Sequence, residues 1–339
     1  MNERPFILSE QELTALLVRA FVGLGVSEAN APLVASVVAA AERDGAPSHG
    51  LQRMAGYAGS LRSGWVDGKA IPRVEQTTPC LFAVDGANGF SQVALAAVRT
   101  QAIEAARAMG MAVVSIRDAH HFAALWPDVE SFADEGLIAV SMVNTRSLIV
   151  TWGGRRKVLG TNPMAFACPR SDGPPIVWDQ ASSLRAQGEV LLAQKAGHQM
   201  PEGTGVDAEG HPATDPTKIL DGGALLPFGG AKGGNLAFAI EILVALFGSG
   251  PMGFEAAARR PPDVQTSPTG QFLLLLDPKR APDGAFGARV RELIDVLHEA
   301  GTARLPGNRR YENRARSRAQ GIPIAAEMYR SLVEMAGPG

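Results

Sequence analysis

The sequence has little of what characterises secreted, nucleic-acid-binding or membrane proteins. Only two of its 339 residues are cysteines, Cys80 and Cys168, and both lie in apolar, strand-like runs. Such thiols are more typical of buried positions in a reducing compartment than of a disulfide. The 32 lysines and arginines nearly balance the 34 aspartates and glutamates, and no basic stripe or block of like charge occurs. We therefore expect neither a nucleic-acid nor a membrane-surface partner.

Long hydrophobic runs and familiar ligand motifs are also missing. The longest apolar run, around residues 236–247, is interrupted by Glu241 and is too short to cross a bilayer. The N-terminus begins Met-Asn-Glu-Arg-Pro, without the apolar core of a signal peptide, so we expect a cytoplasmic protein. There is no Rossmann GxGxxG, Walker loop, CxxC or HExxH. Asp207 and Glu209 resemble part of a calcium loop but lack its later bidentate Glu, so no metal is predicted.

The patterns that are present predict a helical N-terminal part followed by an α/β body. Ser9 and Glu12 form a capping box before a first helix, and further helices are expected over 27–43 and 51–61. From about residue 80, short β-rich runs alternate with helical patterns. The expected strands are 81–84, 112–116, 138–143, 164–167, 176–178 and 272–276, and the expected helices are 92–108, 128–135, 235–247 and 286–300. A Gly-, Asp- and Pro-rich stretch, 197–226, is expected to be a functional loop or lid.

The break between the second and third predicted helices concentrates side chains with useful chemistry. It contains Ser48, His49 and Gly50, and Arg53 lies one turn further on. An imidazole can transfer protons near neutral pH, and a guanidinium forms a fork that suits a carboxylate. The other interpretation is an ordinary polar turn, in which Ser48 caps a helix and His49 is exposed. The spacing alone leaves both interpretations open.

Three further stretches are rich in backbone donors or positive charge. His120 and His121 follow the C-terminal end of a predicted strand, where ligands often bind in α/β proteins. Gly229 and Gly230 precede Lys232 at the start of a predicted helix, an arrangement that can cradle a phosphate. A loop over 304–310 contains three arginines that could add phosphate contacts. Each stretch could also be an ordinary turn or a solvated segment, but together they favour a phosphate-bearing cofactor.

These motifs, in this order, resemble those of a known family. They are Ser48-His49-Gly50 with Arg53, the run 120–126 (HHFAALW), Gly160-Thr161-Asn162-Pro163, the run 226–233 (LPFGGAKG) and the run 304–310 (RLPGNRR). Over residues 8 to 335 the chain is similar to the malate/L-lactate dehydrogenase-like oxidoreductases, whose nicotinamide-binding fold is not the Rossmann fold. Within that family it most resembles the Δ1-piperideine-2-carboxylate/Δ1-pyrroline-2-carboxylate reductases, also described as N-methyl-L-amino acid dehydrogenases.

The resemblance implies a function and an architecture. The function is NADPH-dependent reduction of a cyclic imino acid to L-pipecolate or L-proline, with NADH as the alternative cofactor. The architecture is an α/β fold with a helical N-terminal segment packed on a mixed-sheet body, in a homodimer. Its expected segments are 1–115 on the substrate side, 116–277 for the nicotinamide cofactor, and 278–339 returning to the N-terminal part.

The resemblance also assigns roles by position. His49 would donate the proton, assisted by Ser48 and by Glu189 as a charge relay. Arg53 would hold the substrate carboxylate, and Ala186 and Gln187 would contact the substrate. The implied cofactor-binding residues are His120, His121, Phe122, Ala123, Ala124, Thr161, Trp178, Asp179, Gln180, Gly229, Gly230, Lys232, Arg304, Gly307, Arg309 and Arg310.

At two positions the sequence differs from the imine-reducing branch in a way that bears on the choice of substrate. Gln187 stands where the imine-reducing branch has a histidine, and Glu189 stands where it has an aspartate. Glu189 keeps a carboxylate with a longer reach, while Gln187 and Arg185 would change the substrate wall toward another acidic or polar group. Two alternatives stay open. One is an NAD(P)-dependent 2-hydroxy-acid dehydrogenase of the malate, lactate or ureidoglycolate type, whose substrate in the reducing direction is a 2-oxo acid. The other is a non-catalytic cofactor-binding homologue.

Overall fold

Seven strands form the central sheet of the computed structural model, which describes residues 4–262, 264–282 and 284–337. Their order across the sheet is β2-β3-β4-β11-β5-β6-β7. β3 and β4 are parallel and the other neighbouring pairs are antiparallel, so the sheet is mixed. The strands are β2 (Arg73–Thr78), β3 (Leu81–Phe90), β4 (Met111–His120), β5 (Ile138–Val143), β6 (Met164–Cys168), β7 (Ile176–Gln180) and β11 (Pro268–Leu276). The α/β prediction is confirmed.

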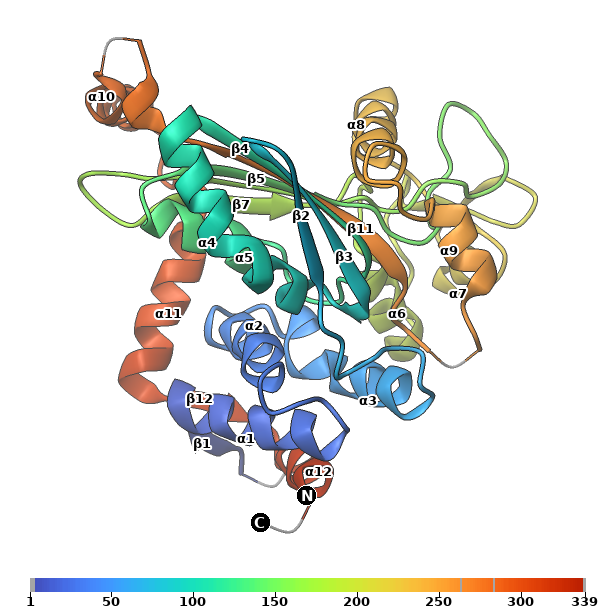
Figure 1. Ribbon diagram of the computed structural model, residues 1–339. Coiled ribbons are helices and arrows are strands. Elements are labelled where there is room, and N and C mark those ends of the chain that lie inside the picture. The colour runs from blue at the N-terminus through green and yellow to red at the C-terminus, as the bar shows by residue number, and fades with distance from the viewer. Residues whose placement is uncertain (1–3, 263, 283, 338–339) are drawn as a thin grey trace.

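One face of this sheet is covered by two helices, α4 (Ser91–Met109) and α5 (Trp126–Asp134), which Figure 1 shows against the strands. Successive side chains of a strand point to opposite faces, so alternate apolar residues enter this layer. Val114 of β4 and Leu273 and Leu275 of β11 are fully buried in it. The largest hydrophobic core of the chain therefore lies between the sheet and these two helices.

A second core lies among helices from both ends of the chain. Its helices are α1 (Glu10–Gly23), α2 (Ala31–Arg43), α3 (Met54–Arg62) and α12 (Ala326–Ala336). Two short strands, β1 (Phe6–Leu8) and β12 (Ile322–Ile324), pair antiparallel beside them. Ser9 caps α1 through a capping box with Glu12, as the sequence predicts. α2 begins later than expected, because the Ser27 hydroxyl accepts from the Asn30 N–H in a turn that precedes the helix.

Residues 197–226, predicted to form a loop or lid, fold instead into part of a small lobe, so that prediction is wrong. The lobe contains α6 (Gln187–Ala196), β8 (Gly205–Val206), β9 (Pro212–Ala213), α7 (Pro216–Leu220) and β10 (Ala224–Leu225). β8 lies between β10 and β9 in a three-stranded antiparallel sheet. Its core includes Ile149, Val190 and Leu225. Strands this short leave no alternating pattern in the sequence from which they could be predicted.

The remaining helices surround the sheet. α8 (Ala231–Glu241) continues into a π-helical turn, η3 (Ile242–Leu246), and packs on Phe272 of β11 through Ile240 and Val244. α9 (Gly253–Arg259) precedes β11, and the single turn η4 (Pro278–Arg280) follows it. In Figure 1, α10 (Phe286–Glu299) lies away from the body, and α11 (Asn308–Gln320) runs along the side of the molecule toward β12.

The structure adds two facts about the organisation of the chain. The predicted boundary between residues 115 and 116 falls inside β4, which pairs with β3 and β11, and the segment limits stay a prediction. None of the helices in the described part of the chain is long and apolar enough to cross a membrane.

Candidate active site

The candidate active site begins in the turn between α2 and α3. Two single 3-10 turns, η1 (Pro47–His49) and η2 (Leu51–Arg53), follow one another and meet at Gly50. The Glu42 carboxylate accepts a hydrogen bond from the Leu51 N–H at 2.7 Å. A Cβ on Gly50 would lie 2.6 Å from that carboxylate, so a larger residue here would displace the Glu42 side chain that holds this turn.

The turn brings a hydroxyl, an imidazole and a guanidinium together. Ser48 Oγ lies 3.2 Å from His49 Nδ1, and Arg53 Nε donates to the Ser48 carbonyl at 2.8 Å. The Arg53 guanidinium also lies 4.5 Å above the ring centre of Phe122, which holds its plane. Ser48 caps no helix and His49 is only half-exposed, so the interpretation of this stretch as an ordinary capped turn is wrong.

The electrostatics around His49 favour its neutral form. Burial, together with the positive charge of Arg53 and the nearby His121, lowers the pKa of His49 to about 4. His121 Nε2 donates to the Asp128 carboxylate at 2.9 Å, and that carboxylate also accepts from Gln271 at 2.8 Å. Asp128, which the sequence analysis missed, therefore fixes the imidazole beside His49.

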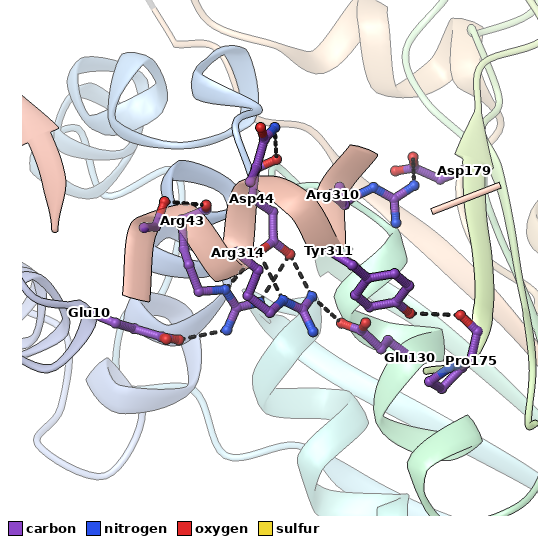
Figure 2. A network of polar contacts seen from close by, with 11 residues as sticks. Glu10, Arg43, Asp44, Glu130, Pro175, Asp179, Arg310, Tyr311 and Arg314 are labelled. Carbon is purple, nitrogen blue, oxygen red and sulfur yellow. Dashed lines mark hydrogen bonds and ion pairs between the residues drawn. The ribbon is translucent and has the colours of Figure 1, made fainter. Parts of the chain in front are cut away.

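A buried network fixes the start of this turn to α11, as Figure 2 shows. The Asp44 carboxylate has no exposed surface and accepts hydrogen bonds from Arg43 at 2.7 Å and from Arg314 at 2.6 Å. Arg314 also pairs with Glu130 of α5 at 2.8 Å, and Arg43 pairs with Glu10 of α1. Burial raises the pKa of Asp44, but the bonds from Arg314 and Arg43 outweigh it and hold that pKa below its ordinary value.

The run 120–124 contributes to the site unevenly. His120 is fully buried, and its two ring nitrogens bond Thr266 at 3.0 Å and Asn88 at 2.9 Å, so its ring faces protein on both sides. Burial lowers the pKa of His120 to about 3. Phe122 and Ala124 are buried, whereas Ala123 is half-buried. In this run, His121 and Phe122 are the side chains that approach His49 and Arg53.

The residues expected around β7 and α11 form a second group. Asp179 accepts from the Leu125 N–H at 3.3 Å and lies 3.7 Å from Arg310, whose guanidinium is 4.6 Å from the ring centre of Trp126. Burial raises the pKa of Asp179 against the opposing charge of Arg310. Of the other predicted residues of this group, Trp178 and Gln180 lie on β7, Gly307 and Arg309 lie at the start of α11, and Arg304 lies in the segment before that helix.

These neighbours differ in exposure. Trp178 stacks on Phe166, while Gln180, Arg304 and Arg309 are exposed. Gly307 begins α11 at φ 91°, and an added Cβ would lie 3.0 Å from the Val177 carbonyl, so this position also requires glycine. Residues 308–310, predicted to lie in a loop, form the first turn of α11.

Thr161, Gly229, Gly230 and Lys232 form a third group around the start of α8. The Thr161 carbonyl accepts from the Ser182 N–H at 2.7 Å, and the Ser182 carbonyl accepts from the Phe228 N–H at 3.0 Å. Gly229 and Gly230 have φ values of 54° and 60° and line a cavity of 890 Å³. A Cβ on Gly230 would meet no atom within 4 Å, and Lys232 is exposed.

The predicted substrate wall lies at the start of α6. Ala186 is the N-cap, and the Gln187 side chain accepts a hydrogen bond from Arg146 at 2.9 Å. Glu189 pairs with Arg185 at 3.6 Å, and no hydrogen bond joins it to Ser48 or His49 among the described residues. The relay role of Glu189 stays a prediction. Arg146 is a second residue that the sequence analysis missed, since no motif includes it.

The predicted residues thus lie in four groups, around His49, Asp179, Gly229 and the start of α6. The family described as malate/L-lactate dehydrogenase matches residues 8–333. The chain belongs to this family.

Individual relatives within the family are similar to this chain over nearly their whole length. The chain is 49% identical over 330 residues to a Δ1-pyrroline-2-carboxylate/Δ1-piperideine-2-carboxylate reductase of Pseudomonas syringae pv. tomato, covering 97% of this chain and 96% of the relative. It is 37% identical to a (2R)-3-sulfolactate dehydrogenase (NADP(+)) of Chromohalobacter salexigens, covering 94% of this chain and 94% of the relative.

A solved structure supports the same placement. The crystal structure of Δ1-piperideine-2-carboxylate reductase from P. syringae pv. tomato superposes with a TM-score of 0.95 at 48% identity, and the match covers 97% of this chain and 99% of that one. The mixed sheet and its helices are therefore arranged as in that solved structure of the same family.

Proposed function

We propose that this protein uses NADPH to reduce a cyclic imino acid of the Δ1-piperideine-2-carboxylate or Δ1-pyrroline-2-carboxylate type to the cyclic L-amino acid. The observation that carries the proposal is the likeness, near half identity over almost the whole chain, to reductases named for these two substrates. The grouping of His49 with Arg53 supports it, because the reaction needs a proton donor and a carboxylate-binding cation.

The residues present fit a dinucleotide. Gly229 and Gly230 open onto the 890 Å³ cavity, and the space beside Gly230 lets a phosphate approach the first N–H groups of α8. Lys232 and Arg310 would add positive charge, and Thr161 and Asp179 would contact the nucleotide as the resemblance implies. The exposed Arg304 and Arg309 favour the 2′-phosphate of NADPH over NADH.

The chain's own residues would position the imine and supply its proton. NADPH, when bound, supplies the hydride that is added to the imine carbon. Arg53 holds the substrate carboxylate with the nitrogens that Ser48 does not engage. Because His49 Nδ1 faces Ser48, Nε2 remains to deliver a proton to the imine nitrogen. A carboxylate on Arg53 offsets the positive charge that lowers the pKa of His49, so substrate binding favours the protonated donor.

The proposal also covers the type of cofactor site, the cellular location and the oligomeric state. We infer a non-Rossmann cofactor site, a cytoplasmic location and a homodimer. A dimer is supported by the exposed apolar side chains of α8 and η3, which include Phe238, Ile242 and Leu246. A two-fold axis can place such a patch against its own copy.

The test is a measurement of NADPH oxidation by the purified protein. Δ1-piperideine-2-carboxylate is offered beside pyruvate and oxaloacetate, and we expect turnover on the imine. His49→Ala should lower kcat by about 100- to 10,000-fold, the range for loss of a general acid. His298→Ala, at an exposed position on α10, is the matched control and should leave kcat unchanged. Turnover on the keto acids alone would assign the chain to the hydroxy-acid dehydrogenases, and NADPH binding without any turnover would indicate a non-catalytic homologue.

A further inference from the structure

A second cavity, separate from the one beside Gly229, carries a concentration of positive charge. Its volume is 290 Å³, the liquid volume of about ten water molecules. Arg146, Lys157 and Arg260 line it, together with Gln187 and Ser147. No aspartate or glutamate is among the described residues that line it. The cavity is thus suited to a small anion and not to a cation.

The three cations make hydrogen bonds only to neutral partners in the described part of the chain. Arg146 donates to Gln187 Oε1 at 2.9 Å, Lys157 donates to the Gly223 carbonyl at 3.1 Å, and Arg260 donates to the Val264 carbonyl. A guanidinium has five N–H donors and an ammonium has three, so most of their donors remain free for a ligand.

The charges in this cavity also repel one another. Burial, together with the charges of Arg260 and Arg53, lowers the pKa of Arg146 to about 10. Burial and the charge of Arg146 lower the pKa of Lys157, and the opposing charge of Asp221 does not outweigh them. Like charges held together at partly buried positions destabilise the site, and an anion bound between them would remove that penalty.

The cavity adjoins the candidate active site. Gln187, which lines it, is the residue that replaces the family's histidine in the substrate wall. Arg146 is close enough to Arg53 for the two charges to interact, and its neighbour Thr145 lies 3.3 Å, hydroxyl to hydroxyl, from Thr161. A substrate with its first carboxylate on Arg53 could therefore extend toward the three cations.

We propose that the Arg146–Lys157–Arg260 cavity binds a second acidic group of the substrate, so that the preferred imino acid is dicarboxylic. This inference rests on the proposed function for the reaction, but the binding that it predicts requires no turnover. Charged hydrogen bonds to carboxylates are among the strong ones, so the second acid should improve affinity at least tenfold.

The experiment compares two planar, non-reducible analogues by isothermal titration in the presence of EDTA. We expect pyridine-2,6-dicarboxylate to bind at least tenfold more tightly than pyridine-2-carboxylate. Arg146→Gln and Arg260→Gln should each reduce this preference about tenfold, and two separate positions keep the test decisive if one variant does not fold. Arg156→Gln, an exposed neighbour of Lys157, is the control and should keep the wild-type preference.

The outcomes separate this inference from the reaction itself. Equal affinity for the two analogues, or a preference that both variants retain, would overturn the second-acid site. Weaker NADPH binding in both variants with the dicarboxylate preference intact would assign the cations to a cofactor phosphate, and would also overturn it. If the wild type prefers the dicarboxylate and both variants lose that preference, but no imine is reduced, the result would contradict the proposed function alone.

Discussion

Two histidine side chains, one buried and one partly buried, make the stability of this protein sensitive to acid. His120 has no exposed surface, and its ring is satisfied in the neutral form, with Nε2 donating to Asn88 and Nδ1 accepting from Thr266. Protonation would turn Nδ1 into a donor and place a charge in the core. His49 has the same preference for the neutral form, although it is less deeply buried.

We predict that the free energy of unfolding falls as the pH drops below about 6.5. Burial lowers the pKa of His120 from its ordinary 6.5 to about 3, so between these values the unfolded chain binds more protons than the folded chain. The neutral His120 therefore stabilises the fold fully at pH values above its pKa in the unfolded chain, and this stabilisation is lost as the pH falls toward its pKa in the folded chain. Each such group contributes a slope of up to about 1.4 kcal/mol per pH unit, and His120 and His49 contribute together.

Urea unfolding at several pH values between 6.5 and 4.5 measures this slope. His120→Asn should remove about half of it, although the lost hydrogen bonds lower the stability at neutral pH. His198→Asn, at an exposed position, should keep the wild-type slope. An unaltered slope in His120→Asn would mean that another group governs acid unfolding.

At the scale of elements, α11 is held by charge more than by apolar packing. No residue of this helix is fully buried, yet its side chains reach α2, α5 and the chain before β7. Arg314 bonds Asp44 and Glu130, and the Tyr311 hydroxyl donates to the Pro175 carbonyl at 2.8 Å. α11 therefore connects the turn of His49 with the strand that contains Asp179.

We predict that Asp44→Asn destabilises the protein by about 3 kcal/mol, because it leaves the arginine charges at a buried site without their carboxylate. It should also lower kcat, since Asp44 lies at the start of the turn that positions Ser48 and His49. Thermal unfolding and steady-state kinetics measure the two effects. Glu292→Gln breaks the exposed pair with Arg289 on α10 and should change stability by less than about 1 kcal/mol. Similar losses in the two variants would argue against a special role of the buried network.

The elements that the sequence predicts are those with an apolar pattern. β5 has the predicted bounds, Ile138–Val143, because alternate side chains are buried. β2 is missed because it is an edge strand whose residues are almost all exposed. α11 is missed because charged residues dominate it, and its partners are remote in sequence: Arg314 and Asp44 are 270 positions apart.

Separation along the sequence also decides which parts of the candidate site can be predicted. Ser48, His49 and Arg53 are close in sequence, so one short motif indicates their grouping. The contacts of Arg146 with Gln187 and of His121 with Asp128 depend on how separate elements pack, and no local pattern reports them. Tertiary packing, which a single sequence does not display, determines these contacts.

At the scale of the whole molecule, two helices present apolar faces to solvent. Phe238, Ile242 and Leu246 recur every fourth residue along α8 and η3, and their exposed fractions are 49%, 40% and 56%. On α10, which lies away from the body in Figure 1, Leu293 and Val296 are also exposed. A single copy of the chain leaves these faces in water, which is unfavourable for contiguous apolar surface.

We predict that a second copy covers the face of α8 and η3. Sedimentation velocity should give the mass of a dimer for the wild type, and Ile242→Glu combined with Leu246→Glu should shift the protein to the monomer, because facing carboxylates would be desolvated at the interface. Ile71→Glu, at a residue that is 82% exposed in the segment before β2, is the matched control and should leave the dimer intact. A wild-type monomer, or a dimer that survives both carboxylates, would rule out this face as the interface. If the double variant is monomeric and still reduces the imine, one chain alone contains a complete active site; if activity falls with the dimer, the geometry around His49 depends on the second copy.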